Sequence, residues 1–213
     1  FLGDDGVWYK VTKIGDYAFD SSENLTSVII PNSVTTIGWY TFQHCLSLTN
    51  IIIPNSVTYI GESAFYGCSS LTTITIPESV TTIEYFVFDR CNNLKNINVD
   101  KKNNNYSSIN GILYNKDGTT LIWYPMGAMT TNLIIPNNVT TIGDFSLYDG
   151  DNIISVIIPI SVTSIRGDAF ARCRNLTDIY YMGTKTQWDS IEIVSVTNLP
   201  LETATKHYNY VMD

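Results

Sequence analysis

The stretch Leu48–Cys68 reads LTNIIIPNSVTYIGESAFYGC, and its phrase recurs along the chain with a fixed period. A related phrase begins 23 residues earlier at Leu25 and 23 residues later at Leu71. The proline of the phrase returns in phase much further along, at Pro136 and Pro159. A fixed period of this size is typical of a solenoid, in which each coil packs mainly on its two neighbours. Such an array presents a long regular surface, so the repeat favours binding over catalysis.

Each repeat contains one short strand followed by a bend. In the first repeat, alternating residues around Val28 and Ile30 indicate a strand, and Pro31 ends it because proline has no N–H for the ladder. A second apolar pair follows, and Gly38 marks a tight bend before a short helix or turn. With strands about 4.8 Å apart, the repeats predict one parallel sheet roughly 30 Å long. Its seven strands centre on Val28, Ile51, Ile74, Ile97, Ile134, Val156 and Ile179.

Two repeated positions are expected to form the core. At the first of these positions a phenylalanine recurs, and the rings are expected to stack as an aromatic spine inside the coils. The position holds Leu147 in one coil and otherwise Phe19, Phe42, Phe65, Phe88 and Phe170. The other holds cysteine, or Ser22 and Gly150 in other coils, so it requires a small buried side chain. Because C-x-x-C is absent, zinc binding is disfavoured. We expect buried, reduced thiols, with disulfides between coils as the alternative, at Cys45, Cys68, Cys91 and Cys173.

The composition excludes several classes of partner. The 213-residue chain has a net charge of −8 and a pI of about 4.6, which argues against nucleic acid and anionic membrane surfaces. No apolar run approaches the roughly 18 residues that a membrane span requires, so we expect no membrane insertion. Phe1 begins in mid-repeat, so we expect either a fragment of a longer protein or a mature, trimmed chain, in which an export signal would not be visible.

The repeated phrase L-x-x-I-x-I-P-x-S-V-T-x-I-G-x-x-A-F-x-x-C closely resembles the BspA-like leucine-rich repeats of bacterial surface proteins. The match in one coil comprises Leu48, Ile51, Ile53, Pro54, Ser56, Val57, Thr58, Ile60, Gly61, Ala64, Phe65 and Cys68. Small residues able to hydrogen-bond backbone occupy the family's asparagine position, at Ser33, Ser56, Ser79, Asn138 and Ser161. The resemblance implies an α/β repeat solenoid of the leucine-rich-repeat type. It would be a right-handed coil of about seven 23-residue turns, with a parallel β-sheet on one side and short helices or turns on the other.

The repeat is interrupted between Asp100 and Pro136, which are 36 residues apart, 13 more than one period. Asp100 itself replaces the proline that ends the strand in other coils. Within the insert, Ile112–Tyr114 and Leu121–Tyr124 flank the turn-forming segment Asn115–Gly118. This pattern predicts a β-hairpin within a variant coil rather than a domain boundary.

The period is lost again after Tyr180. The terminal segment resembles the ends of related proteins, where it would cover the last apolar layer and the open sheet edge. We therefore expect a solenoid over residues 1–180, with an irregular hairpin-containing coil at 100–136. Residues 181–213 are expected to form a C-terminal capping segment.

No catalytic motif stands out: the chain has no G-x-S-x-G and no phosphate-binding glycine loop. His44 precedes Cys45, but that cysteine position belongs to the core, so a Cys–His nucleophile is disfavoured. The acidic segments Asp4–Gly6 and Asp149–Asn152 contain calcium-type ligands, yet both lack the spacing of a known loop and consist of ordinary turn formers. We therefore predict no catalytic residue, no metal and no cofactor, and a protein that is not an enzyme.

The outward face of the predicted sheet is the candidate binding surface. If Val28 and Ile30 point inward, then Ser27 and Ile29 point outward. The equivalent positions are almost uncharged and partly apolar. Such a patch can mark a partner site, although β-branched residues also occur there simply because they suit strands. The candidate partner-binding residues are Ile29, Asn50, Ile52, Thr73, Thr75, Asn96, Asn98, Ser155, Ile157, Asp178 and Tyr180.

The resemblance to BspA-like adhesins implies a non-catalytic protein-binding or adhesion module, located extracellularly or at the cell surface. Its implied partners are host extracellular matrix proteins or other microbial surface proteins. The alternative is a structural spacer or assembly array whose functional region lies outside this fragment.

Overall fold

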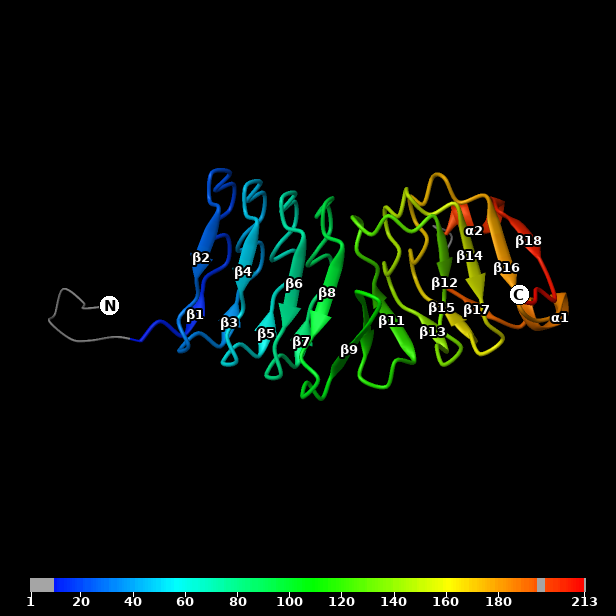
Figure 1. Ribbon diagram of the computed structural model, residues 1–213, viewed down its shortest axis with the longest axis horizontal. Coiled ribbons are helices and arrows are strands. Elements are labelled where there is room, and N and C mark those ends of the chain that lie inside the picture. The colour runs from blue at the N-terminus through cyan, green and yellow to red at the C-terminus, as the bar shows by residue number, and fades with distance from the viewer. Residues whose placement is uncertain (1–9, 195–197, 213) are drawn as a thin grey trace, which may run out of the picture. The chain divides into compact units, whose positions relative to one another are not determined.

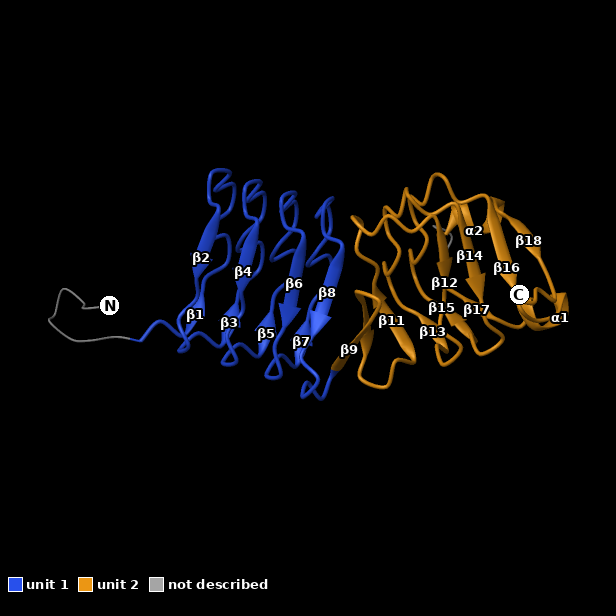
Figure 2. Ribbon diagram, in the orientation of Figure 1, with its two compact units in different colours: residues 1–105 blue, residues 106–213 orange. Residues whose placement is uncertain are grey.

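The computed structural model describes residues 10–194 and 198–212. The chain divides into two compact units, residues 1–105 (unit 1) and 106–213 (unit 2) (Figure 2). Each unit is a β-solenoid with two rows of strands, one on each side of its coils (Figure 1). The leucine-rich-repeat solenoid is therefore confirmed. The acidic segment Asp4–Gly6 lies outside the described residues.

Unit 1 carries longer strands in its first row and shorter strands in its second. The first row contains β2 (Ser27–Ile29), β4 (Asn50–Ile52), β6 (Thr73–Ile76) and β8 (Asn96–Val99). These strands form two separate parallel pairs, β2 with β4 and β6 with β8. The second row is one parallel four-stranded sheet, made of β1 (Lys13–Ile14), β3 (Thr36–Ile37), β5 (Tyr59–Ile60) and β7 (Thr82–Ile83).

Unit 2 also has two rows. Its first row is a parallel sheet in the order β12 (Asn132–Ile134), β14 (Ser155–Ile158), β16 (Asp178–Tyr181) and β18 (Thr205–His207). Its second row runs in the order β17 (Glu192–Ile193), β15 (Ser164–Ile165), β13 (Thr141–Ile142), β11 (Thr120–Trp123), β10 (Ile112–Asn115) and β9 (Tyr106–Ile109).

All seven strands that the repeat predicts are present, but the prediction of one continuous sheet is wrong. The first-row strands are divided among three sheets, and β18 adds a further strand to the last of them. For the second row, the sequence indicated only a pair of apolar residues in each repeat and not a strand. The strands of this row are two residues long in most coils, and in four of these strands the isoleucine is buried at 0% exposure: Ile37, Ile60, Ile142 and Ile165.

The predicted hairpin forms within the insert. Strands β10 and β11 are antiparallel, with Leu113 opposite Trp123, and β11 then pairs in parallel with β13. A third antiparallel strand, β9, precedes them and was not predicted. Asn110 and Gly111 connect it to β10 with φ angles of 52° and 81°, the left-handed conformation that a two-residue hairpin turn requires.

The bends contain turns, and the described part of unit 1 contains no helix. Alternate residues of each bend donate their N–H groups to the next coil, as in Phe42 N to Ala64 O at 2.8 Å and His44 N to Tyr66 O at 2.8 Å. Two left-handed residues recur in each bend, on either side of the spine position. They are Tyr17, Tyr40, Ser63, Phe86, Phe145 and Asp168, and Ser21, His44, Gly67, Arg90, Asp149 and Arg172.

The aromatic spine is confirmed. In unit 1 its rings stack nearly parallel, with centroid separations of 5.2 Å for Phe19–Phe42, 5.5 Å for Phe42–Phe65 and 6.1 Å for Phe65–Phe88. In unit 2 the equivalent residues Leu147 and Phe170 are at most 1% exposed. Parallel-displaced rings at this spacing add to the stabilisation that burial alone provides.

The four cysteines are buried and free, as expected. Each thiol donates to the carbonyl of the spine residue 26 positions earlier: Cys45 to Phe19 (3.2 Å), Cys68 to Phe42 (3.1 Å), Cys91 to Phe65 (3.0 Å) and Cys173 to Leu147 (3.0 Å). The column therefore joins each coil to the preceding one. Burial raises the pKa of Cys45 and of Cys173 to about 12.

A second column of hydrogen bonds confirms the role expected for the family's asparagine position. The hydroxyls of Ser33, Ser56, Ser79 and Ser161 each donate to a backbone carbonyl 22 residues earlier, at 2.6 to 2.7 Å. Asn138 donates in the same way to Gly118 O at 2.9 Å. In the irregular coil, the buried Asn103 takes over and donates to Val80 O at 3.0 Å.

The C-terminal segment continues both rows. Strand β17 pairs with β15, and β18 pairs with β16. Two short helices accompany them, α1 (Lys185–Trp188), which begins with a capping box formed by Thr184 and Gln187, and α2 (Leu199–Thr203). Trp188 and Leu201 are at most 7% exposed and belong to the core of unit 2. These contacts support the capping role, which remains a prediction.

Candidate functional site

The predicted binding face is exposed in unit 1. Its two outward columns are Ser27, Asn50, Thr73 and Asn96, and Ile29, Ile52, Thr75 and Asn98, all of them exposed. Ile29 is opposite Ile52 in the β2–β4 pair, and these side chains are 93% and 74% exposed. Thr75 is opposite Asn98 in the β6–β8 pair. The face is therefore uncharged, apolar on β2 and β4, and polar on β6 and β8.

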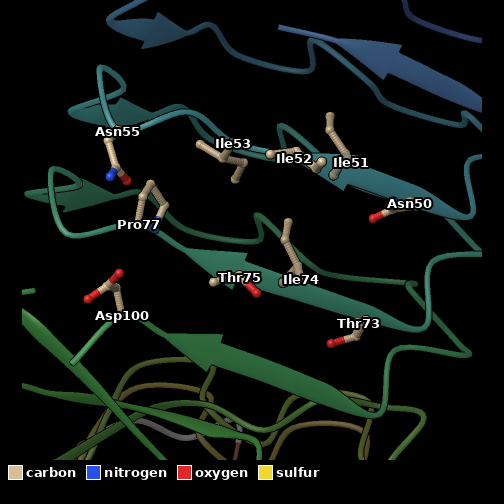
Figure 3. A pocket seen from close by; sticks show the side chains of 10 residues that line it. All are labelled: Asn50, Ile51, Ile52, Ile53, Asn55, Thr73, Ile74, Thr75, Pro77 and Asp100. Carbon is tan, nitrogen blue, oxygen red and sulfur yellow. The ribbon is translucent and has the colours of Figure 1, made fainter. Parts of the chain in front are cut away.

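A groove of about 230 Å³ lies between β4 and β6, where the two strand pairs of unit 1 meet without being paired to each other (Figure 3). Four of the predicted residues line it: Asn50, Ile52, Thr73 and Thr75. The buried side chains of Ile51, Ile53 and Ile74 also contribute to the lining. The groove thus combines an apolar base with amide and hydroxyl groups from the exposed face.

Most polar groups of the groove lie toward its two ends, with Thr75 between them (Figure 3). Asn50 and Thr73 lie at one end, and Asn55, Pro77 and Asp100 at the other (Figure 3). Thr73 Oγ1 accepts a hydrogen bond from Asn98 Nδ2 at 3.2 Å, which links the groove to the next strand. The lining can therefore offer both donors and acceptors to a partner that covers it.

Asp100 is the one charged residue of this lining. Because aspartate replaces the usual proline, its N–H is free to donate to Ile76 O at 2.9 Å. Its carboxylate accepts from the N–H of Lys102 at 2.9 Å. The β6–β8 pairing ends at Ile76–Val99, one residue further along the repeat than the β2–β4 pairing, which ends at Ile29–Ile52.

Sequence reasoning noted Asp100 as a departure from the repeat but did not assign it to the site. It also missed Asn55 and Pro77, which follow the ends of their strands. Both residues lie two or three positions after an outward-facing residue of the same coil, Ile52 or Thr75. That spacing could have assigned them to the same face. The break between β4 and β6 has no counterpart in the sequence, because the phrases on either side of it are nearly identical.

The expectation of a uniformly exposed face is wrong in unit 2. Ser155 and Ile157 are 7% and 9% exposed, and every residue of β14 is buried. Ile157 lies in register between Ile134 and Tyr180, whose side chains are larger than the threonines and asparagines of β6 and β8. A partner could not reach Ser155 or Ile157 without displacing their neighbours.

Asp178 and Tyr180 are half-buried and engaged with the C-terminal segment. His207 Nε2 lies 2.7 Å from Asp178 Oδ1, and this hydrogen bond lowers the pKa of the Asp178 carboxyl. The Tyr180 ring stacks on His207 with centroids 4.5 Å apart and contacts Tyr210 at 4.8 Å. In unit 2 the predicted face therefore holds β18 in place.

The groups considered for chemistry have structural partners. Asp151 pairs with Arg174 at 2.6 Å, and Asp149 lies 3.8 Å from Arg172. The His44 ring packs edge-on against Tyr66. Over residues 10–194 and 198–212, no cluster of three or more His, Cys, Asp or Glu residues could hold a metal ion. Within the same ranges, no helix has the length and hydropathy to cross a bilayer.

The fold and the repeated hydrogen-bond columns define a leucine-rich-repeat solenoid. The family model of the BspA type leucine-rich repeat region matches residues 9–115 and 126–204 in six copies. The chain therefore belongs to the BspA-type leucine-rich repeat family, as its resemblance implied. A search of curated proteins finds no match.

Two solved structures show the same fold. The pneumococcal vaccine antigen PcpA is 28% identical, with a TM-score of 0.71 over 79% of this chain and 42% of that one. A leucine-rich repeat protein from Eubacterium ventriosum is also 28% identical, with a TM-score of 0.67 over 80% of this chain and 57% of that one. The chain thus spans about half the length of these relatives.

Proposed function

We propose that this chain is a non-catalytic, protein-binding module of a bacterial cell-surface or secreted protein, and that the exposed sheet face of unit 1 is its binding surface. The observation that carries the proposal is the groove between β4 and β6, bordered by Ile52 at 74% exposure. Its partners would be host extracellular matrix proteins or surface proteins of other microbes.

Three features support this proposal. An apolar area with a polar border matches the usual anatomy of a protein interface. The groove is lined by residues of β4 and β6, each of which is held by its own pairing partner, so binding would require little ordering of the site. The structural relative PcpA is a vaccine antigen, and an effective antigen must be accessible to antibodies, which supports a location outside the cell.

The proposal is tested by measuring binding of the 213-residue chain to purified extracellular matrix proteins with surface plasmon resonance. In the variant Ile52→Lys, a charged side chain replaces an exposed apolar one at the border of the groove. Because a lysine ammonium loses favourable hydration when a partner covers it, we expect the Kd to rise at least about tenfold, which corresponds to ~1.4 kcal/mol.

The matched control is Ile160→Lys, which makes the same change at a residue of unit 2 that is 59% exposed. Circular dichroism should show that both variants keep the wild-type fold, because both sites face solvent. Equal affinities for the wild type and Ile52→Lys would contradict the assignment of the surface. A chain that binds no partner and instead self-associates would support a structural array.

A further inference from the structure

A second surface of unit 1 lies on the opposite row of strands. The second residue after the end of each of β1, β3, β5 and β7 is, in turn, Asp16, Trp39, Glu62 and Tyr85. Hydrogen bonds fix these coils in register: Trp39 N donates to Asp16 Oδ1 at 3.0 Å, and Tyr40 N donates to Glu62 O at 2.9 Å. Acidic and aromatic side chains therefore alternate along this edge, one coil apart. We call these four residues the acidic–aromatic row.

Trp39 is held in a fixed orientation while half of it faces solvent. Its Nε1–H donates to Tyr59 Oη at 3.1 Å, and the side chain is 52% exposed. A Cβ added to Gly61 would lie 2.6 Å from Trp39 Cδ1, so the indole lies against the backbone of the residue that precedes Glu62. The missing side chain of Gly61 thus lets the indole of Trp39 pack against the coil that carries Glu62.

The two acids of the row differ in their partners. Asp16 lies 3.4 Å from Lys13 Nζ and accepts the N–H of Trp39, so its charge is partly balanced. Glu62 is exposed, and its carboxylate forms no ion pair or hydrogen bond within the described part of the chain. In the row its position lies between Trp39 and Tyr85, and the side chain of Tyr85 is 54% exposed.

We propose that the acidic–aromatic row binds an arginine- or lysine-containing segment of a protein partner. A cation over an indole or phenol ring is attracted by the ring quadrupole, and the neighbouring Glu62 carboxylate would pair with its remaining donors. The proposal commits to a cationic partner because of charge complementarity: the unbalanced group of the row is an acid, and the chain carries a net charge of −8.

The protein uses the same chemistry internally. The Arg90 guanidinium lies 5.3 Å from the ring centroid of Tyr66, and Arg172 lies 5.2 Å from that of Tyr148. In both pairs the arginine comes from the coil that follows the tyrosine, so the coil spacing suits a ring and a cation on adjacent coils. The position 24 residues after Trp39 holds Ser63, so the next coil supplies no cation to the indole, and a cation there would have to come from a partner.

This surface is independent of the sheet-face groove. The groove lies between β4 and β6 of the first row and is uncharged except for Asp100, whereas the acidic–aromatic row follows the strands of the second row. The two surfaces therefore select partners by different chemistry, and Ile52→Lys should leave binding at the row unchanged.

The test measures binding of a fluorescently labelled nona-arginine peptide to the full chain by fluorescence anisotropy at physiological salt. We expect Glu62→Gln and Trp39→Leu each to weaken binding about fivefold to tenfold, the range expected from losing one cation–π or ion-pair contact at a partly exposed site. The matched control is Glu23→Gln, which removes the same charge from another exposed glutamate of unit 1. It should change the Kd by less than about twofold.

Several outcomes would overturn the proposal. Equal weakening by Glu62→Gln and Glu23→Gln would show that diffuse charge attracts the peptide. If Trp39→Leu bound the peptide as tightly as the wild type, the indole would not contribute to binding. Failure of nona-arginine to bind, with Trp39-dependent binding of a neutral oligosaccharide instead, would assign the surface to sugars. Circular dichroism and chemical denaturation of each variant would separate loss of binding from loss of folding.

Discussion

The left-handed residues of the bends show how single positions shape each coil. A non-glycine residue in this conformation costs of the order of 1 kcal/mol, yet Tyr40, His44 and Arg90 all adopt it, with φ between 52° and 56°. The ladder of N–H groups donated to the next coil offsets this cost. In one coil the left-handed position is occupied by glycine, Gly67, which adopts a φ of 72° without a side-chain clash.

We predict that Gly67→Ala lowers the free energy of unfolding by about 1–2 kcal/mol. An alanine at this position would have to adopt a φ of 72°, which is strained for a residue with a side chain. Its Cβ would also lie 2.8 Å from His44 Cδ2. Gly15→Ala is the control, because a Cβ there meets no atom within 4 Å, and it should change stability by less than about 0.5 kcal/mol. Urea denaturation measures both; an equal effect of the two variants would contradict the role of the left-handed position.

The raised thiol pKa values lead to a second prediction at this scale. Burial raises the pKa of Cys45 from 9.0 to about 12, so the folded state favours the neutral thiol. This contribution to stability is complete below pH 9 and is lost as the pH rises from there toward 12. We expect the free energy of unfolding to fall over that alkaline range, and thiol-specific reagents at pH 8 to react only after denaturant is added. Rapid labelling of the native protein would contradict this.

Individual elements show what the sequence predicted and where it failed. The strands around Ile51 and Ile74 were predictable because alternation and proline mark them. Strand β9 was not predicted, although Asn110-Gly111 is a strong hairpin signal, because its sequence YSSI has two serines at its centre. The burial of Ile157 could not be predicted, because it depends on the size of cross-strand neighbours rather than on the alternation of its own strand.

The groove illustrates the same limit at the level of strand pairing. The phrases that form β4 and β6 are nearly the same, so periodicity predicts identical pairing throughout. The groove lies where the pairing between β4 and β6 is absent, and no change of residue type marks that point. Sequence could therefore identify the outward residues Asn50, Ile52, Thr73 and Thr75, but not that they face one another across an opening.

At the C-terminus, we predict that β18 depends on ionised Asp178. The hydrogen bond from His207 lowers the pKa of this carboxyl below 3.8, so its contribution is present above that pH and lost as the pH falls through the lowered value. Hydrogen exchange of the β18 amides should accelerate in acid relative to the rest of unit 2. Asp178→Asn should show fast exchange already at neutral pH, whereas Asp189→Asn, which removes an exposed helical ion pair with Lys185, should leave β18 protected.

For the whole molecule, stability is expected to be distributed along the coils. In a solenoid each coil interacts with its nearest neighbours, so damage in one coil affects the adjacent ones most. Unit 1 and unit 2 each contain their own rows of strands and their own stretch of the spine. A destabilising substitution in the spine of unit 1 should therefore lower the stability of unit 1 before that of unit 2.

We predict that Phe65→Ala lowers stability by about 3–5 kcal/mol, because it leaves a cavity between Phe42 and Phe88. Phe65→Leu should cost less, since Leu147 occupies the equivalent position in unit 2. Hydrogen exchange with mass spectrometry should show the loss of protection in unit 1 before unit 2. Simultaneous exposure of both units would indicate that the chain unfolds as one cooperative body.

The columns of serine and cysteine hydrogen bonds constrain how such a chain can change its length in evolution. Each donor reaches a carbonyl at a constant offset of 22 or 26 residues. Duplicating or deleting a complete coil gives every donor an equivalent acceptor, so it leaves no buried group unsatisfied. Adding or removing part of a coil shifts the offset for all columns at once, unless compensating residues arise, as Asn103 does beside the insert. Gene rearrangements that preserve the repeat are therefore structurally neutral changes, and they lengthen the surface available to partners one coil at a time.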